Sequence, residues 1–116
     1  DCVIDAIDCV DSKVALYKWA YKRNVPLITS MGAASKTDPT QIKIAPISRT
    51  TVCPLAARVR RMVRGAGISD FPAVFSTETP VPVAGHAKNL GSVITITGTF
   101  GLMLANYVIR ETIQNI

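Results

Sequence analysis

The sequence predicts an α/β fold with a mixed parallel and antiparallel sheet. Strand-like apolar runs alternate with amphipathic helical segments, and one run alternates apolar and polar residues as an edge strand does. The chain has 116 residues, of which 48% are hydrophobic and 18% charged. This composition suits a single domain over 1–116 and excludes a disordered chain. The expected order is strand, helix, strand, strand, helix, strand, loop, strand, helix.

The first strand is expected within residues 2–8, an apolar run that reads as buried. A helix should follow over 13–23, with Asp11 as a suitable cap and Pro26 beyond its end. The apolar run 27–30 predicts the next strand.

The middle of the chain predicts an edge strand and a basic helix. In 41–44, Ile42 and Ile44 point one way and the polar residues the other, which is typical of an antiparallel or edge strand. Pro54 suits the first turn of a helix that should extend to residue 63 or 64 and stop at Gly65.

The last part of the chain predicts two strands, a loop and a helix. The strands are expected over 73–76 and 93–97, the loop over 79–91, and the helix from Thr99 to about Ile113. The apolar stretch 93–109 contains several threonines and glycines. It is shorter and more polar than the roughly 20 apolar residues of a membrane span, so no membrane partner is expected.

The cysteines and the histidine indicate neither a zinc site nor a disulfide framework. Cys2, Cys9 and Cys53 form no C-x-x-C pair, and His86 is the single histidine. Reduced thiols in a cytoplasmic protein are therefore expected. Cys2 is expected to be inert core, and the carboxylate of Asp8 should raise the pKa of Cys9. Cys53, at a predicted helix start, has the most favourable surroundings for a thiolate, but a structural role is favoured.

Three aspartates, Asp5, Asp8 and Asp11, follow one another at three-residue spacing. Asp8 is expected where the chain leaves the first strand, and open α/β sheets bind ligands at the carboxyl ends of strands. A carboxylate there could hold Mg²⁺ that bridges nucleotide phosphates. Alternatively, Asp8 and Asp11 only cap the following helix and favour its positive end. The spacing alone leaves both interpretations open.

The formal net charge of +5 makes a polyanion such as RNA a plausible partner. Four arginines lie on one half of the predicted helix that begins at Pro54: Arg58, Arg60, Arg61 and Arg64. Arginines so arranged can contact phosphates. An ordinary solvated helix face explains the same pattern.

Several runs, in one order, resemble the ThiF/MoeB/HesA superfamily of adenylating enzymes, which are related to ubiquitin-activating enzymes. These runs are 3–8, 13–16, 25–33 and 38–42. Within the superfamily, the runs 38–41, 54–57 and 74–78 are similar to the tRNA threonylcarbamoyladenosine dehydratase (TcdA/CsdL) branch. The likeness covers nearly the whole chain, and the paired C-x-x-C zinc motifs of other branches are absent.

The resemblance implies the C-terminal part of a Rossmann-like, doubly wound sheet. The chain opens directly into an apolar run, and the family's glycine-rich nucleotide loop, which precedes that run, is absent from it. We therefore expect a piece of a larger enzyme that does not adenylate anything alone. The family's Mg-ATP aspartate falls on Asp8, and the backbone near Ala6 would lie beside the nucleotide. Catalytic residues remain unassigned, and Ala73 stands where some relatives carry a cysteine.

The implied reaction adenylates the threonylcarbamoyl carboxylate on a tRNA adenosine with ATP and cyclises it with loss of water. Arg60, Arg61 and Arg64 are then candidate tRNA contacts. The resemblance also implies a homodimer and leaves room for a sulfur-transfer protein partner. Two alternatives stay open: an adenylyltransferase of thiamine or molybdopterin type that acts on a sulfur-carrier protein, and a non-catalytic RNA- or protein-binding module.

Overall fold

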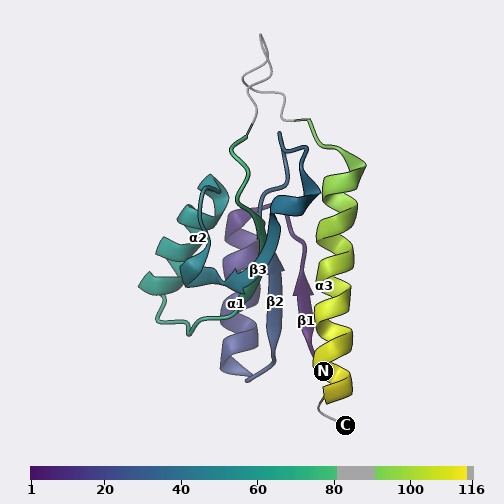
Figure 1. Cartoon of the computed structure of the whole chain (residues 1–116). Helices are drawn as coiled ribbons and strands as arrows, with labels where there is room; N and C mark the ends of the chain where they lie inside the picture. Colours follow the sequence, from purple (N-terminus) through teal and green to yellow (C-terminus); the bar gives the residue numbers. More distant parts are fainter. Residues whose placement is uncertain (81–90, 115–116) are drawn as a thin grey trace.

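The computed structural model describes residues 1–80 and 91–114, which form three layers (Figure 1). A four-stranded sheet in the order β1-β2-β4-β3 lies in the middle. Helices α1 and α2 pack on one face of the sheet and α3 on the other. The α/β class with a mixed sheet is confirmed. The expected loop over 79–91 falls almost entirely outside the described residues.

Three strands run parallel and one antiparallel. The parallel strands are β1 (Val3–Asp5), β2 (Leu27–Ser30) and β4 (Pro72–Ser76), and β3 (Ile42–Pro46) runs against β4. The predicted antiparallel edge strand is therefore confirmed. The first strand is shorter than expected and ends at Asp5, so Asp8 lies in the turn beyond it.

Helix α1 spans Val10–Lys22 and begins earlier than predicted. Its N-cap is Cys9, whereas the expected cap, Asp11, lies in the first turn. There the Asp11 carboxylate still favours the positive end of the helix. Helix α2 spans Pro54–Gly65, so the predicted helix with proline in its first turn is confirmed.

The predicted strand over 93–97 is wrong, because these residues open helix α3 (Ile94–Gln114) instead. The run is rich in β-branched residues, which favour strands only where a pleated neighbour is available. Here Ile96, Phe100 and Leu104 recur at helical spacing and are all buried against the sheet. Tertiary packing therefore overrides the local preference.

Two cores separate the layers. On one face, Val14, Tyr17 and Ala20 of α1 and Ala56, Val59 and Val63 of α2 pack against Leu27, Ala73 and Phe75. On the other face, the buried stripe of α3 packs against Ile28, Ile42 and Val74. Successive residues of each strand therefore point to opposite faces of the sheet and pack against different helices. None of the helices within the described ranges has the length and apolarity that crossing a bilayer demands.

Candidate functional site

The carboxyl ends of the three parallel strands meet at one edge of the sheet, the upper end in Figure 1. The strands end there at Asp5, Ser30 and Ser76. This is the edge at which open α/β sheets bind ligands. A groove at the opposite edge is lined by Cys2, Leu27 and other residues from the amino ends of the strands, so it lies away from this site.

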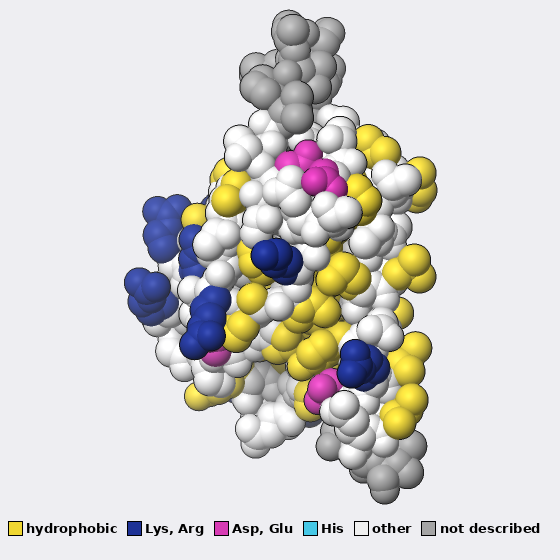
Figure 2. Space-filling view, in the orientation of Figure 1, with side chains coloured by type: hydrophobic (Ala, Val, Ile, Leu, Met, Phe, Trp, Pro, Cys, Tyr) yellow, Lys and Arg dark blue, Asp and Glu magenta, His cyan; other side chains and the backbone are white. Residues whose placement is uncertain are grey.

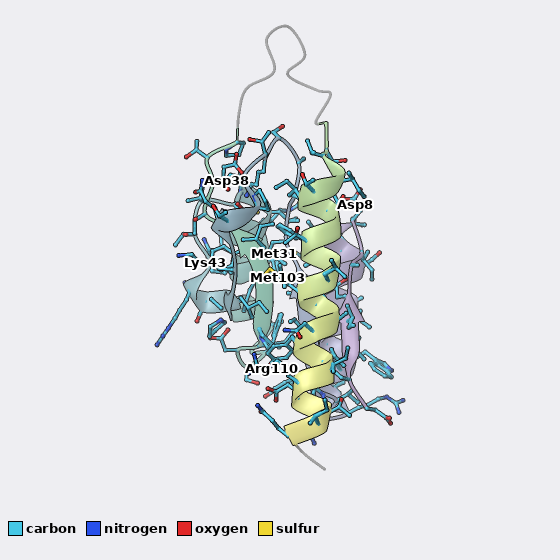
Figure 3. The ribbon with its side chains drawn as sticks, turned by 45° about the vertical axis from the view of Figure 1, so that its right-hand side comes forward. Asp8, Met31, Asp38, Lys43, Met103 and Arg110 are labelled. Carbon is cyan, nitrogen blue, oxygen red and sulfur yellow. The ribbon has the colours of Figure 1, made fainter. Side chains whose placement is uncertain are left out.

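Asp8 lies at the carboxyl edge, in the turn between β1 and α1 (Figure 3). Its side chain is exposed, as is Ala6 in the same turn. No hydrogen bond joins the Asp8 carboxylate to another residue of the described ranges. The Asp8 carboxylate is therefore accessible at the carboxyl edge of the sheet, where the family resemblance predicts a nucleotide. Among the residues placed by the structure, no group of three or more His, Cys, Asp or Glu side chains could hold a metal ion.

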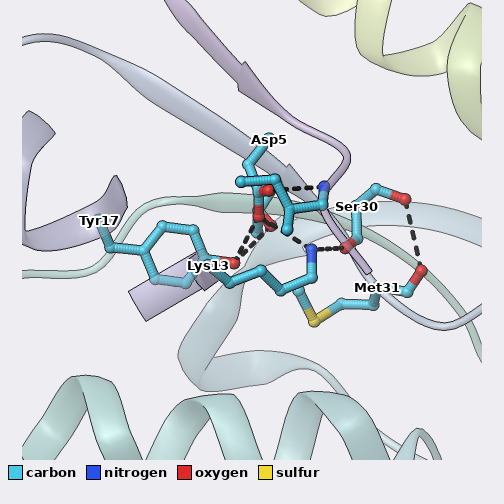
Figure 4. A network of polar contacts seen from close by, with 7 residues as sticks. Asp5, Lys13, Tyr17, Ser30 and Met31 are labelled. Carbon is cyan, nitrogen blue, oxygen red and sulfur yellow. Dashed lines mark hydrogen bonds and ion pairs between the residues drawn. The ribbon is translucent and has the colours of Figure 1, made fainter. Parts of the chain in front are cut away.

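A buried polar network around Asp5 supports this turn (Figure 4). The Oδ2 atom of Asp5 accepts hydrogen bonds from Lys13 Nζ at 2.9 Å, Tyr17 Oη at 2.8 Å and Thr29 Oγ1 at 2.5 Å. Its Oδ1 atom accepts the backbone N–H of Ile7 at 2.9 Å. Lys13 Nζ also donates to the Ser30 carbonyl at 2.8 Å.

This network connects the ends of β1 and β2 with the first turns of α1. Asp5 and Lys13 are 0% and 1% exposed, so the ion pair between them is shielded from water. The bond to Ile7 holds the backbone of the turn that carries Ala6 and Asp8. Along the sequence, Asp5 stands out only as one of three evenly spaced aspartates, and that spacing does not predict the network. The one sequence signal was a lysine at i and a tyrosine at i+4 on the buried stripe of a helix.

The network sets the ionisation of its members. Burial by itself would raise the pKa of Asp5, but hydrogen bonds from Thr29, Lys13, Ile7 and Tyr17 together lower it below its usual value. Burial, together with the neighbouring Asp5 carboxylate, raises the pKa of Tyr17 far above that of a free tyrosine. At neutral pH Asp5 is therefore a carboxylate and Tyr17 a protonated phenol.

A second set of polar contacts fixes the loop after β2. The Glu78 carboxylate accepts the backbone N–H groups of Thr37 at 2.9 Å and Asp38 at 2.9 Å. The Asp38 and Thr37 amides are the main cause of the lowered pKa of Glu78. Asp38 in turn caps the short 3₁₀ helix η1 (Pro39–Gln41) through the Thr40 N–H at 3.0 Å. The Asp-Pro-Thr-Gln run therefore has a structural explanation as a capped turn.

The three cysteines lie in different surroundings. Cys53 is buried as the N-cap of α2, with its Sγ close to Gly32, which supports the structural role. Cys9 is exposed, and the Ser12 amide, then the Ser12 hydroxyl, lower the pKa of its thiol, although no full capping hydrogen bond forms. The expected rise caused by Asp8 is therefore wrong, because the amides at the start of α1 outweigh nearby carboxylates.

Cys2 also differs from its predicted role as inert core, since it is only half-buried. Burial still raises the pKa of its thiol. His86 lies outside the described residues.

The arginines of α2 form a basic surface on the side of the molecule where Figure 2 shows Lys and Arg side chains gathered. Arg58, Arg61 and Arg64 are exposed. Arg60 differs, because its guanidinium donates to the Thr50 carbonyl at 2.8 Å and to Thr50 Oγ1 at 2.6 Å. All four arginines lie on α2 as predicted, but the side chain of Arg60 is held by its hydrogen bonds to Thr50.

Comparisons with known proteins point to one family. No protein-family model matches the chain. It is 48% identical over 84 residues to a tRNA threonylcarbamoyladenosine dehydratase of Bacillus subtilis, which covers 72% of this chain and 33% of that protein. It is 35% identical over 133 residues to the protein of that name from Haemophilus influenzae, covering 98% of this chain and 51% of that protein.

Solved structures that are similar to this chain carry the same name as these relatives. The structure of the E. coli tRNA N6-threonylcarbamoyladenosine dehydratase in complex with AMP has a TM-score of 0.86 and 31% identity, covering 97% of this chain and 48% of that one. The same enzyme in complex with ATP gives a TM-score of 0.85. The chain therefore spans about half the length, or less, of the relatives it matches.

Proposed function

Because the chain belongs to the tRNA threonylcarbamoyladenosine dehydratase branch of the ThiF-like superfamily, we propose that it forms part of an ATP-dependent tRNA-modifying enzyme. The enzyme adenylates the threonylcarbamoyl carboxylate on a tRNA adenosine and closes a ring with loss of water. The similarity over 97% of this chain to an enzyme solved with ATP and with AMP carries the proposal.

The proposed chemistry has two steps. A carboxylate oxygen of the threonylcarbamoyl group attacks the α-phosphorus of ATP, and pyrophosphate leaves. The adenosine nitrogen that bears the threonylcarbamoyl group then attacks the activated acyl carbon and closes a five-membered ring, AMP leaves, and the nitrogen loses its proton. The nucleophile of the second step is already held inside the substrate, so the protein has to orient it rather than supply a covalent group.

The carboxyl edge of the sheet is suited to a magnesium–nucleotide complex. Mg²⁺ is commonly bound through one or two carboxylates together with substrate phosphates. Asp8, exposed beyond β1, offers one such carboxylate, and the backbone near Ala6 offers the surface for the nucleotide. When bound, the ion would neutralise charge on the phosphates. The Asp5–Ile7 bond would keep Asp8 at a fixed place in the turn.

Substrate assays on the full-length protein that contains this chain test the proposal. Pyrophosphate release should require tRNA that carries threonylcarbamoyladenosine, and unmodified tRNA should not replace it. The product tRNA should lose the mass of one water molecule. Release that depends instead on a small ubiquitin-like carrier protein would favour the sulfur-carrier adenylyltransferase. ATP-independent tRNA binding without turnover would favour the non-catalytic module.

The assembly and location of the protein are also proposals. A homodimer is supported by apolar side chains left exposed on α3, among them Ile94 and Leu102 at 78% and 74%. The free edge of β1, which pairs only with β2 in the described sheet, is a further contact surface.

We propose that the enzyme acts in the cytoplasm. A sulfur-transfer protein is a further proposed partner, and co-purification with the full-length protein would show whether one accompanies it.

The basic surface of α2 gives a prediction about RNA. We propose Arg60, Arg61 and Arg64 as tRNA contacts, with Arg61 and Arg64 as the more available pair because Arg60 is bound to Thr50. In Arg61→Gln/Arg64→Gln, the slope of log affinity against log salt should flatten by roughly two units, at about 0.9 per phosphate contact. Filter binding of tRNA at several salt concentrations measures this slope.

Two controls accompany the salt experiment. Arg110→Gln removes one arginine charge from α3, away from α2, and should leave the slope unchanged. Arg60→Gln separates a tRNA contact from a structural role, because a structural role lowers the melting temperature and leaves the slope as it was. An unchanged slope in the double variant would mean that this helix face is merely solvated.

Replacing Cys53 by serine in the full-length protein should preserve most of the activity. The proposed reaction needs no covalent enzyme intermediate, and Cys53 is buried at the start of α2. Steady-state turnover with the modified tRNA measures the effect. A loss of about a thousandfold or more, toward the roughly 10⁶-fold loss caused by removing a catalytic nucleophile, with an unchanged melting temperature would contradict the structural assignment.

A further inference from the structure

Two lysines are buried in this fold, and their surroundings differ. Lys13 is 1% exposed and Lys36 is 3% exposed. Lys13 is neutralised by the Asp5 carboxylate at 2.9 Å. The ammonium of Lys36 donates to the Ser76 carbonyl at 3.2 Å, and no carboxylate within the described ranges lies within 4.0 Å of it.

Two carboxylates close to Lys36 or to its partner Ser76, those of Asp38 and Glu78, are hydrogen-bonded to other groups. Glu78 follows Ser76 by two residues, yet its carboxylate accepts the amides of Thr37 and Asp38. The Asp38 carboxylate accepts from Thr40 and Gln41. A lysine ammonium has three donors, and burying it without a counter-charge is costly. A single carbonyl leaves most of that cost uncompensated.

The Lys36 ammonium lies at the same edge of the sheet as the Asp8 turn. Ser76, its partner, is the last residue of β4, and β4 is separated from β1 by β2 alone. The strand register puts Asp5 level with Ala73, so the Ser76 carbonyl lies two strands across and three residues farther along, about 14 Å from the end of β1 and on the side toward which the Asp8 turn extends. The Glu78 bonds and the bond from Ser35 N to the Gly91 carbonyl at 2.9 Å hold the loop that carries Lys36.

From this juxtaposition we propose that Lys36 is the counter-charge for an oxyanion of the reactants. The group is either the carboxylate that becomes adenylated or a phosphate of the nucleotide, and both chemistries need a fixed cation at this edge. The inference rests on the proposed function and adds a binding group to it. Lys13 cannot take this role, because Asp5 already neutralises it.

Lys36→Gln in the full-length protein tests the inference. Glutamine is one atom shorter than lysine, but it offers the Ser76 carbonyl an N–H donor without a charge. Affinity for the oxyanion should fall by about 10- to 100-fold, as expected for a lost charged hydrogen bond. The melting temperature without ligands should stay the same or rise, because an uncompensated buried charge is removed. Lys43→Gln, on the exposed face of edge strand β3, is the matched control and should change neither quantity.

Separate measurements distinguish the two sources of the oxyanion. Weaker binding of AMP and ATP, measured by equilibrium dialysis, assigns Lys36 to a phosphate. An increased KM for threonylcarbamoylated tRNA with unchanged ATP binding assigns it to the carboxylate. Because dialysis needs no turnover, it reports on Lys36 even if the proposed reaction fails in the substrate assays.

Unchanged affinities for nucleotide and tRNA in Lys36→Gln would overturn the inference, whatever happens to the melting temperature. If that variant does not fold, Lys36→Met provides a second neutral side chain of similar length for the same measurements. Failure of both neutral variants to fold would also overturn it, because Lys36 would then be a structural strut between the loop and β4.

Discussion

Asp8→Ala in the full-length protein should lower ATP turnover by about a thousandfold or more, because it removes the one carboxylate proposed to hold the magnesium–nucleotide complex. The fold should be preserved. Asp8 is exposed in the turn after β1, outside the Asp5 network. Pyrophosphate release measures turnover, and circular dichroism and the melting temperature check the fold.

Asp11→Ala is the matched control for this experiment. Asp11 is also an exposed aspartate close to the start of α1, but it lies within the helix rather than in the turn. Its loss should cost a few tenths of a kcal/mol up to about 1 kcal/mol of stability through the helix dipole and leave turnover nearly unchanged. Normal turnover in Asp8→Ala would end the nucleotide assignment, and equal losses in both variants would favour the helix-capping interpretation.

Lys13→Met should destabilise the protein by about 3–5 kcal/mol, the usual cost of removing one partner of a buried ion pair. The substitution leaves the Asp5 carboxylate buried without its cation and removes the donor to the Ser30 carbonyl. Urea unfolding measures the change in free energy. Lys18→Met removes the same charge from an exposed position of α1 and should stay within about 0.5 kcal/mol of the parent.

The double variant Asp5→Asn/Lys13→Met separates charge from packing. If the penalty comes from an uncompensated buried charge, neutralising both partners should recover part of the lost stability. A double variant as unstable as the sum of the single variants would instead show that the geometry of the network matters more than its charge.

The same network predicts how stability depends on pH. The pKa of Asp5 is lower in the folded than in the unfolded protein. Its contribution is therefore fully present above the unfolded value of about 3.9 and is lost as the pH falls through the folded value. Urea unfolding between pH 5 and pH 2 should show stability falling in acid, and Asp5→Asn should reduce the steepness of that fall.

The elements with local sequence patterns could be predicted from the residues alone. The alternation of Ile42 and Ile44 identified an edge strand, and Pro54 followed by an amphipathic arginine-rich run identified α2. Asp8 was assigned to the carboxyl edge, where the structure places it, although β1 ends earlier at Asp5. These predictions succeeded because helical and strand periodicities are properties of neighbouring residues.

Features that depend on partners distant in sequence become visible only in the folded chain. The run that opens α3 is helical because Ile96 packs on the sheet, and the local β-branched residues gave the opposite prediction. Lys13 is neutralised by Asp5 and Arg60 is bound to Thr50, whereas Lys36 is buried against a carbonyl that follows it by forty residues. Whether a buried cation is compensated depends on which strand ends the fold brings together, and residue spacing along the chain carries no information about that.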